Sequence, residues 1–430
     1  MKNVLCSIME LLFGKCITNQ TVKMAKKNFH EWNEDTISSP NLESVWALQL
    51  KIRIETCDVT NWLQTKYLRR SDSKFLFRAI AAAENISSSC NSTIKMSFPY
   101  EIKPMEEAMK NELKANFIGE TEGYLEAGPK KFIVTSRYAE FASTIYNFKV
   151  RPDDAWVVTF PRSGTTLMQE LVWLIKNDLD FETASKVLLL DRSPQIEHIT
   201  QITRKLQEKV EAEVRGDPVR EAIASQVFVD PIPLLDAAPG SRTIKSHLPL
   251  SFLPPNLLDI GKVVYVCRST KDVAVSFYHL GEQVRNLEYV GDFKTFWNYF
   301  ENNKVWNAPY WDHIRDAWEK KDHPNMLFLF YEDIDMEGTI RKVAAHLNKQ
   351  LTEAQLKKLA EHMHFDNFKK NTSVNLEPVL IAHCSKRKNQ FIRKGKVGGW
   401  GDYFTPEMNA RADKWIAENL ARIPGFAFPK

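Results

Sequence analysis

A short run of one arginine, three hydroxyl residues and one glycine follows an apolar segment of the chain. Residues 155–160 read AWVVTF, and the residues after Pro161 are Arg162, Ser163, Gly164, Thr165, Thr166 and Leu167. The stretch from there to residue 176 has the apolar spacing of an amphipathic helix. A tight loop between a strand and a helix directs backbone N–H groups and the positive end of the helix dipole at a ligand. The loop therefore predicts a phosphate or sulfate site, and the alternative is a plain turn with Thr165 or Thr166 as the helix cap.

A lysine and a histidine stand two residues apart after a second apolar segment. Residues 242–245 read RTIK, and Lys245 is followed by Ser246 and His247. On an extended chain, side chains two residues apart share a face. A histidine with an ordinary pKa of about 6.5 can accept a proton at neutral pH. His247 is therefore a candidate general base for an acceptor hydroxyl, beside the cation Lys245.

An arginine and a serine follow a third apolar segment, residues 262–267, which reads KVVYVC. Arg268 comes directly after it, and Ser276 lies two turns into the helix expected next. Arg268 can bind a phosphate with two parallel hydrogen bonds while Ser276 donates a third. The alternative is an arginine that pairs with Asp272 in a solvated turn.

Two more segments carry residues that could bind anions or metals. Residues 326–331 read MLFLFY and end at Tyr331, which precedes the acidic pair Glu332 and Asp333. Near the C-terminus, Arg393, Lys394 and Gly395 begin a Gly-rich stretch that reads as an ordered loop up to residue 401. Two adjacent cations beside a glycine would suit a phosphate, but a solvated surface turn has the same residues.

The elements that must position these side chains alternate between apolar strands and helical stretches from about residue 97 onward. This alternation is typical of an α/β fold with a mainly parallel central sheet and helices on both faces. Ligands of such sheets bind outside the carboxyl ends of the strands, so the four segment ends should converge on one crevice. Residues 1–95 are rich in Ser, Asn and Lys and have patchy periodicity, which predicts a separate extension or linker.

The composition is that of an ordinary globular protein. The 430 residues are 43% hydrophobic and carry a formal net charge of +4, so no charge excess indicates nucleic acid or an acidic membrane as a partner. Six cysteines are scattered without metal-ligand spacing, which favours reduced thiols, no metal site and a cytoplasmic location. The alternative is that the apolar segment 4–13 is a signal sequence, although Glu10 lies inside it and it is too short to span a bilayer.

Together these segments resemble the cytosolic sulfotransferase family over about residues 97–430. FPRSGTT resembles its 5′-phosphosulfate loop, KSHLP its catalytic segment, CRSTKDVAVSFYH its 3′-phosphate segment and RKGKVGGW its C-terminal signature. The flanking text, NFKVRPDDAWVVTFPRSGTT and QELVWLIKNDLDFE, is most similar to insect members. The resemblance implies the P-loop-like sulfotransferase fold, with residues 1–95 as an N-terminal extension and residues 96–430 as the sulfotransferase domain.

The resemblance also implies the reaction. A sulfuryl group would pass from 3′-phosphoadenosine 5′-phosphosulfate (PAPS) to the hydroxyl of a small apolar acceptor, such as a phenol, steroid, retinoid-like alcohol or xenobiotic, and leave the product PAP without any metal. His247 would be the base, with Lys245 and Arg162 assisting at the transferred group. The nucleotide would be held by residues of several segments, including HMHFDNFKKN: Arg162, Ser163, Gly164, Thr165, Thr166, Leu167, Arg268, Ser276, Tyr331, Met363, Phe365, Phe368, Arg393, Lys394 and Gly395.

Several positions depart from the family's commonest pattern. Arg162 stands where Lys is usual, which keeps the charge but loses a compact donor. Leu167 replaces a Trp beside the nucleotide, and Met363 replaces a hydroxyl residue. Of the short dimer motif near the C-terminus only Thr405 is present, so the usual dimer is not predicted.

Two other functions remain open from the residues alone. One is a phosphotransferase or hydrolase that uses Mg-ATP and binds the metal through Glu332 and Asp333. The loop lacks the first Gly and the Lys of GxxxxGK[ST], which suggests a nucleotide held without the usual magnesium ligands. The other is a protein that binds a nucleotide or apolar ligand without turnover, against which Lys245 and His247 argue.

Overall fold

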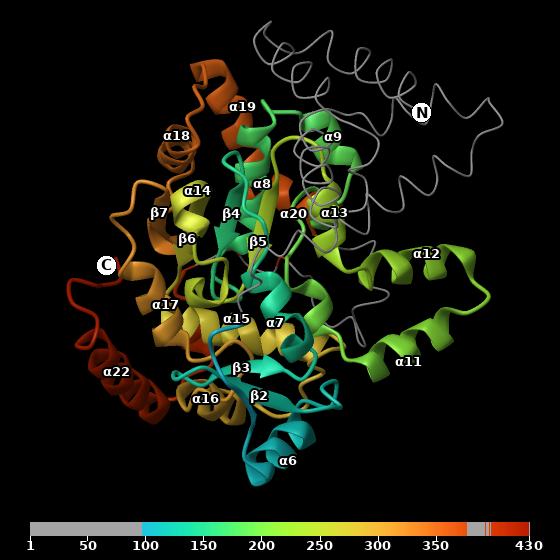
Figure 1. Cartoon of the computed structure of the whole chain (residues 1–430). Helices are drawn as coiled ribbons and strands as arrows, with labels where there is room; N and C mark the ends of the chain where they lie inside the picture. The colour runs from blue at the N-terminus through green and yellow to red at the C-terminus, as the bar shows by residue number, and fades with distance from the viewer. Residues whose placement is uncertain (1–96, 376–391, 393–394, 396, 430) are drawn as a thin grey trace, which may run out of the picture. The chain divides into compact units, whose positions relative to one another are not determined.

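The computed structural model describes residues 97–375, 392, 395 and 397–429. Its centre is a parallel sheet whose strands stand in the order β5-β4-β6-β7 (Figure 1). The strands are β4 (Ala155–Val158), β5 (Thr243–Ser246), β6 (Lys262–Cys267) and β7 (Met326–Phe330). They are the four segments predicted from the sequence, with small differences at their ends.

Both faces of this sheet are buried, because successive side chains of each strand enter different cores. Trp156 and Val158 pack in one core with Tyr265, while Val157 packs in the other with Val264. The first core is built with α15 (Thr270–Gln283), α16 (Phe293–Glu301) and α17 (Tyr310–Trp318). The second is built with α8 (Thr165–Lys176), α18 (Met336–His346) and α19 (Glu353–Met363). The predicted α/β architecture is confirmed.

A second, antiparallel sheet was not predicted. Its strands, in the order β1-β2-β3, are β1 (Ile102–Pro104), β2 (Tyr124–Ala127) and β3 (Phe132–Thr135). Strands this short do not show enough alternation to be recognised in a sequence. The neighbouring helices are α6 (Glu107–Asn116) and α7 (Tyr138–Tyr146).

Between β4 and β5 the chain forms a series of mostly short helices. They are α9 (Phe181–Lys186), α10 (Leu189–Arg192), η2 (His198–Gln201), α11 (Arg204–Val214), α12 (Pro218–Val227) and α13 (Pro231–Ala237). Figure 1 shows α11 and α12 projecting sideways from the sheet as a pair. They are joined by a small core of their own, which contains Val210, Val214 and Ala224.

The C-terminal part differs in one detail from the prediction of a plain loop up to residue 401. Gly399–Asp402 forms a short 3-10 helix, η5, because the Tyr403 N–H reaches back to the Trp400 carbonyl. Thr405 then caps α22 (Pro406–Leu420) with its hydroxyl. The remaining elements are η3 (Leu250–Phe252), α14 (Leu257–Ile260), η4 (Tyr331–Asp333) and α20 (Phe365–Lys370).

Some predictions fall outside the described residues. They concern the extension 1–95 with its apolar segment 4–13, Arg393 and Lys394, and each cysteine except the buried Cys267. Within the described part of the chain, no helix combines the length and apolarity needed to cross a membrane.

Candidate active site

The loop after β4 presents the uncapped start of a helix. Gly164 is the N-cap of α8 with a φ of 101°, and among the described residues no side chain caps the first turn of this helix. Thr165 does not cap the helix, since its hydroxyl lies 2.6 Å from the Thr159 hydroxyl. The alternative of a plain turn with a threonine cap is therefore wrong. The backbone donors of this turn are left for an anion, which the helix dipole favours.

Gly164 is required by both conformation and space. Its φ lies in the left-handed region, where a side chain is strained. A Cβ at this position would also lie 2.6 Å from the ring of Tyr331. Tyr331 therefore packs directly against the loop backbone, which explains why the end of β7 contributes to this site.

The cations predicted to bind phosphate are linked to one another. The Arg162 Nε donates to the Ser276 hydroxyl at 3.0 Å, and the Arg268 Nη1 donates to the Arg162 carbonyl at 3.2 Å. The Arg268 guanidinium lies over the Tyr331 ring, 4.4 Å from its centroid. The turn that carries Arg268 is not solvated, because Asp272 is only 4% exposed. The alternative of a solvated surface turn is wrong here.

His247 is held with one ring nitrogen turned to the protein. Its Nδ1 lies 2.9 Å from the Thr159 carbonyl, and since a carbonyl can only accept, Nδ1 carries the proton. The Nε2 atom, which no described residue contacts by a hydrogen bond, is then the ring atom able to accept a proton. Burial, and next the neighbouring Lys245, hold the pKa of His247 well below its ordinary value. The ring is therefore neutral at physiological pH.

Lys245 is a buried cation whose pKa is lowered. Burial lowers the pKa of its ammonium to about 8, the carboxylate of Glu197 opposes this, and Arg162 lowers the pKa further. The strand β5, on which Lys245 lies, pairs directly with β4, so the ammonium and the phosphate-type loop belong to the same edge of the sheet.

The residues predicted to pack on adenine come together at the end of α19 and the start of α20. Met363 and Phe368 are buried, and Phe365 begins α20. Gly395 comes close to them, because a Cβ there would lie 2.4 Å from the Phe365 ring. The structure thus places Gly395 beside the segment predicted to pack on adenine, from which it is distant in the sequence.

In the acidic pair after β7, Glu332 has a structural role. One Glu332 oxygen accepts the Ser269 N–H at 2.8 Å, at the start of α15. Burial raises the pKa of the Glu332 carboxyl. Among the described residues, no group of three or more His, Cys, Asp or Glu side chains is placed to hold a metal ion.

One cavity of about 770 Å³ unites these residues. With the exception of the buried Ser163, every predicted site residue that the structure describes lines it: Arg162, Gly164, Thr165, Thr166, Leu167, Lys245, His247, Arg268, Ser276, Tyr331, Met363, Phe365, Phe368 and Gly395. The strand ends thus converge on one crevice, as predicted.

The cavity continues beyond the predicted residues into a mainly apolar wall that the sequence did not identify. This wall comes from the helices between β4 and β5, from α15 and from Trp306, and includes Leu189, Pro194, Ile202, Val229, Leu235, Leu280 and Val284. The buried carboxylate of Glu197, which contacts the His247 backbone, was also missed. No motif marks these residues, because their position depends on how the helices pack.

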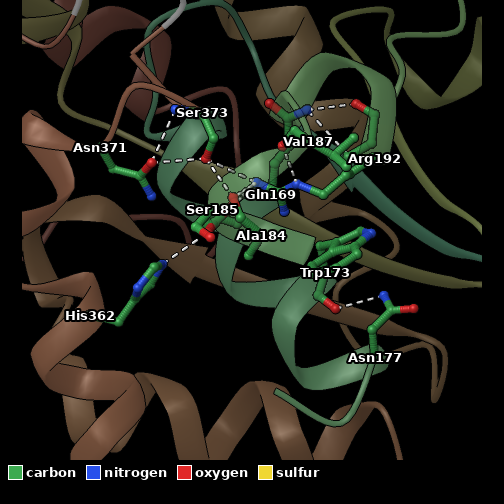
Figure 2. Close-up of polar contacts among 12 residues, drawn as sticks. Gln169, Trp173, Asn177, Ala184, Ser185, Val187, Arg192, His362, Asn371 and Ser373 are labelled. Atoms are coloured by element: carbon green, nitrogen blue, oxygen red, sulfur yellow. Dashed lines mark hydrogen bonds and ion pairs between the residues drawn. The ribbon is translucent and has the colours of Figure 1, made fainter. Parts of the chain in front are cut away.

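A buried polar network connects α8, the helix that follows the phosphate-type loop, to the end of α19, where the residues predicted to pack on adenine begin (Figure 2). Arg192 donates to one Glu170 oxygen at 2.7 Å, and the His362 Nε2 lies 2.9 Å from the other. The Arg192 and Glu170 side chains are 2% and 0% exposed. Glu170 belongs to α8, and His362 directly precedes Met363. The network therefore links α8 to the end of α19, and both helices contribute residues to the cavity.

A parallel sheet with helices on both faces and a crevice at its strand ends defines an α/β protein of the class that binds ligands at that edge. The family model for the sulfotransferase domain matches residues 152–424. The chain is 31% identical over 307 residues to the luciferin sulfotransferase of Photinus pyralis, covering 69% of this chain and 80% of that protein. It is 30% identical over 320 residues to human sulfotransferase 4A1, covering 71% and 97% of the two chains.

The solved structures point the same way. Retinol dehydratase crystallised with retinol and PAP shares 39% of its sequence with this chain, with a TM-score of 0.72, and the match covers 78% of this chain and 100% of that one. The same enzyme has also been crystallised with androsterone and PAP. The protein belongs to the sulfotransferase family. It is a PAPS-dependent enzyme that transfers a sulfuryl group to the hydroxyl of a small acceptor.

Proposed function

We propose that the acceptor hydroxyl is deprotonated by His247 at the point where the nucleotide and acceptor parts of the cavity meet. The observation that carries this proposal is the Nδ1 contact to Thr159, which leaves Nε2 as the proton acceptor. Its position is supported by two backbone contacts. Lys245, two residues before His247, exchanges backbone hydrogen bonds with Ile196 and with Pro194, which belongs to the mainly apolar wall of the cavity, here called the acceptor wall. On its other side, β5 pairs with β4, which leads into the phosphate-type loop.

The roles of the other residues follow from their charges. PAPS supplies the sulfuryl group, which forms a bond to the acceptor oxygen as its bond to the phosphate oxygen breaks. His247 takes the proton of the acceptor hydroxyl. Lys245, Arg162 and the backbone donors at the start of α8 stabilise the negative charge that develops on the bridging oxygen. Their fixed positions also favour the in-line arrangement that the transfer requires.

The remaining predicted residues bind the nucleotide in this proposal. Arg268 and Ser276, with Arg393, Lys394 and Gly395, hold the 3′-phosphate. Ser163, Gly164, Thr165, Thr166 and Leu167 surround the phosphosulfate, and Tyr331, Met363, Phe365 and Phe368 pack around adenosine. The described members of this set, except the buried Ser163, are supported by their common cavity.

The acceptor is an apolar alcohol of the size of retinol or androsterone. Both compounds occupy the structures of the 39% identical retinol dehydratase, and the acceptor wall of this chain is mainly apolar. A panel of acceptors, assayed with PAPS for release of PAP, tests this. We expect the highest kcat/KM with hydrophobic ring-containing or polyene alcohols. A preference for sugars or other highly polar hydroxyl compounds would contradict the assignment.

Residues 96–430 are the sulfotransferase domain and residues 1–95 an extension of a cytoplasmic protein. The family match to residues 152–424 lies entirely within the proposed domain, which supports this division. Limited proteolysis of the full chain, with the fragments identified by mass spectrometry, checks it. We expect a resistant product that starts near residue 96. A resistant product that retains the first residues would overturn the boundary.

A further inference from the structure

Glu197 is a buried carboxylate that contacts the segment carrying His247. Glu197 is 2% exposed and directly precedes η2. One oxygen accepts the His247 backbone N–H at 2.7 Å and the Gln195 side-chain N–H at 2.6 Å. The other accepts the Ser246 hydroxyl at 2.9 Å. Both oxygens thus act as acceptors, as in an ionised carboxylate, and these hydrogen bonds oppose the burial that raises the pKa of Glu197.

Glu197 is one of three groups that hold His247 in place by hydrogen bonds. The His247 carbonyl lies 3.0 Å from the His313 Nε2, and the ring Nδ1 donates to Thr159. Since the His247 carbonyl can only accept, the His313 Nε2 carries the proton, and the Nδ1 of the neutral ring accepts the Tyr265 hydroxyl at 2.8 Å. The backbone N–H, the backbone carbonyl and the ring of His247 each have one partner, and Glu197 supplies the first.

We propose that Glu197 is a positioning residue for sulfuryl transfer, which fixes the main chain of His247 and places a negative charge beside Lys245. This inference rests on the proposed roles of His247 and Lys245. Loss of a group that holds a reacting residue in place can lower turnover by about 10- to 100-fold, because the reacting atoms must lie within a fraction of an ångström of their productive positions.

The charges around Lys245 give this role a second consequence. Lys245 interacts electrostatically with four ionisable groups, namely Arg162, Glu197, His198 and His247. Of these, Glu197 carries the negative charge and raises the pKa of Lys245, against the lowering by burial to about 8. The hydroxyl of Tyr138 is the ionisable group that faces Glu197 from α7. Without the carboxylate, Lys245 would lose its proton at a lower pH.

The test is Glu197→Gln, which keeps the shape of the side chain and removes its charge. We expect kcat to fall about 10- to 100-fold while PAP affinity stays close to wild type. The alkaline limb of the kcat profile should also move to lower pH, because Lys245 deprotonates earlier. The matched control is Glu120→Gln, at a carboxyl that is 1% exposed and bonded to backbone N–H groups outside the cavity. Its profile should match wild type.

Thermal unfolding of each variant separates a loss of fold from a loss of position. If Glu197→Gln does not fold, Glu197→Asp carries the test, with a reduced kcat and an unshifted alkaline limb as the expected result. Wild-type kcat and pH profile in either folded variant, while His247→Ala is inactive, would overturn the inference alone. Normal turnover of His247→Ala would instead overturn the proposed function.

Discussion

Replacing His247 by alanine is expected to lower kcat by about 100-fold or more and to leave PAP affinity nearly unchanged. The magnitude is the usual contribution of a general base. The ring reaches the cavity, but the nucleotide phosphates are assigned to other residues, so binding should not depend on it. Single-turnover transfer from PAPS measures the chemical step, and a titration with PAP measures the affinity.

The pH dependence of the wild-type enzyme gives an independent check of the same role. A base must be unprotonated to act, and the pKa of His247 is held well below its ordinary value by burial and by Lys245. The acid limb of the kcat profile should therefore lie well below the ordinary histidine pKa of about 6.5. Activity should be constant through neutral pH.

The matched control for His247→Ala is His323→Ala, since His323 lies outside the cavity. A small loss of rate in His247→Ala, with normal binding, removes it from the base role.

Replacing Arg268 by alanine is expected to weaken PAP binding by about 10- to 100-fold. A hydrogen bond between a guanidinium and a phosphate is charge-assisted, and hydrogen bonds to charged groups contribute about 1.5–3 kcal/mol. The variant also loses the contact with the Arg162 carbonyl and the stacking on Tyr331, which help to order the loop. Calorimetric titration with PAP measures the change directly.

The matched control for Arg268 is Arg341→Ala. The Arg341 side chain is 53% exposed and pairs with Glu353 on the surface, outside the cavity. It should bind PAP as the wild type does. If Arg268→Ala binds PAP with unchanged affinity, the assignment of Arg268 to the 3′-phosphate is wrong. If both variants lose affinity to the same extent, the effect is one of net charge rather than of the site.

The sequence predicted the parts of the site that lie at the ends of long apolar strands. The segments around Val157 and Val264 are buried on both faces and read as continuous apolar runs, which makes their ends easy to place. The loop residues Arg162–Leu167 and the pair Lys245 and His247 are fixed by those ends. Their roles could therefore be predicted from residue type and spacing, and all of them except the buried Ser163 line one cavity.

The parts that could not be predicted depend on packing across large sequence separations. Glu197 is 50 residues from His247, and nothing in the spacing of the two indicates that they form a hydrogen bond. The acceptor wall is formed by helices between β4 and β5 whose apolar residues read as ordinary core. A residue type alone does not tell whether an apolar side chain faces a cavity or the interior.

The central claim is that the cavity binds the PAP nucleotide without a metal ion, and isothermal titration of the full chain tests it most directly. One series uses PAP in buffer with EDTA, and a second uses ATP with excess magnesium. Tight binding of PAP in the presence of EDTA, with weak or no binding of Mg-ATP, is the result we predict. Binding of Mg-ATP alone would contradict the account and direct attention to Glu332 and Asp333 at the end of β7.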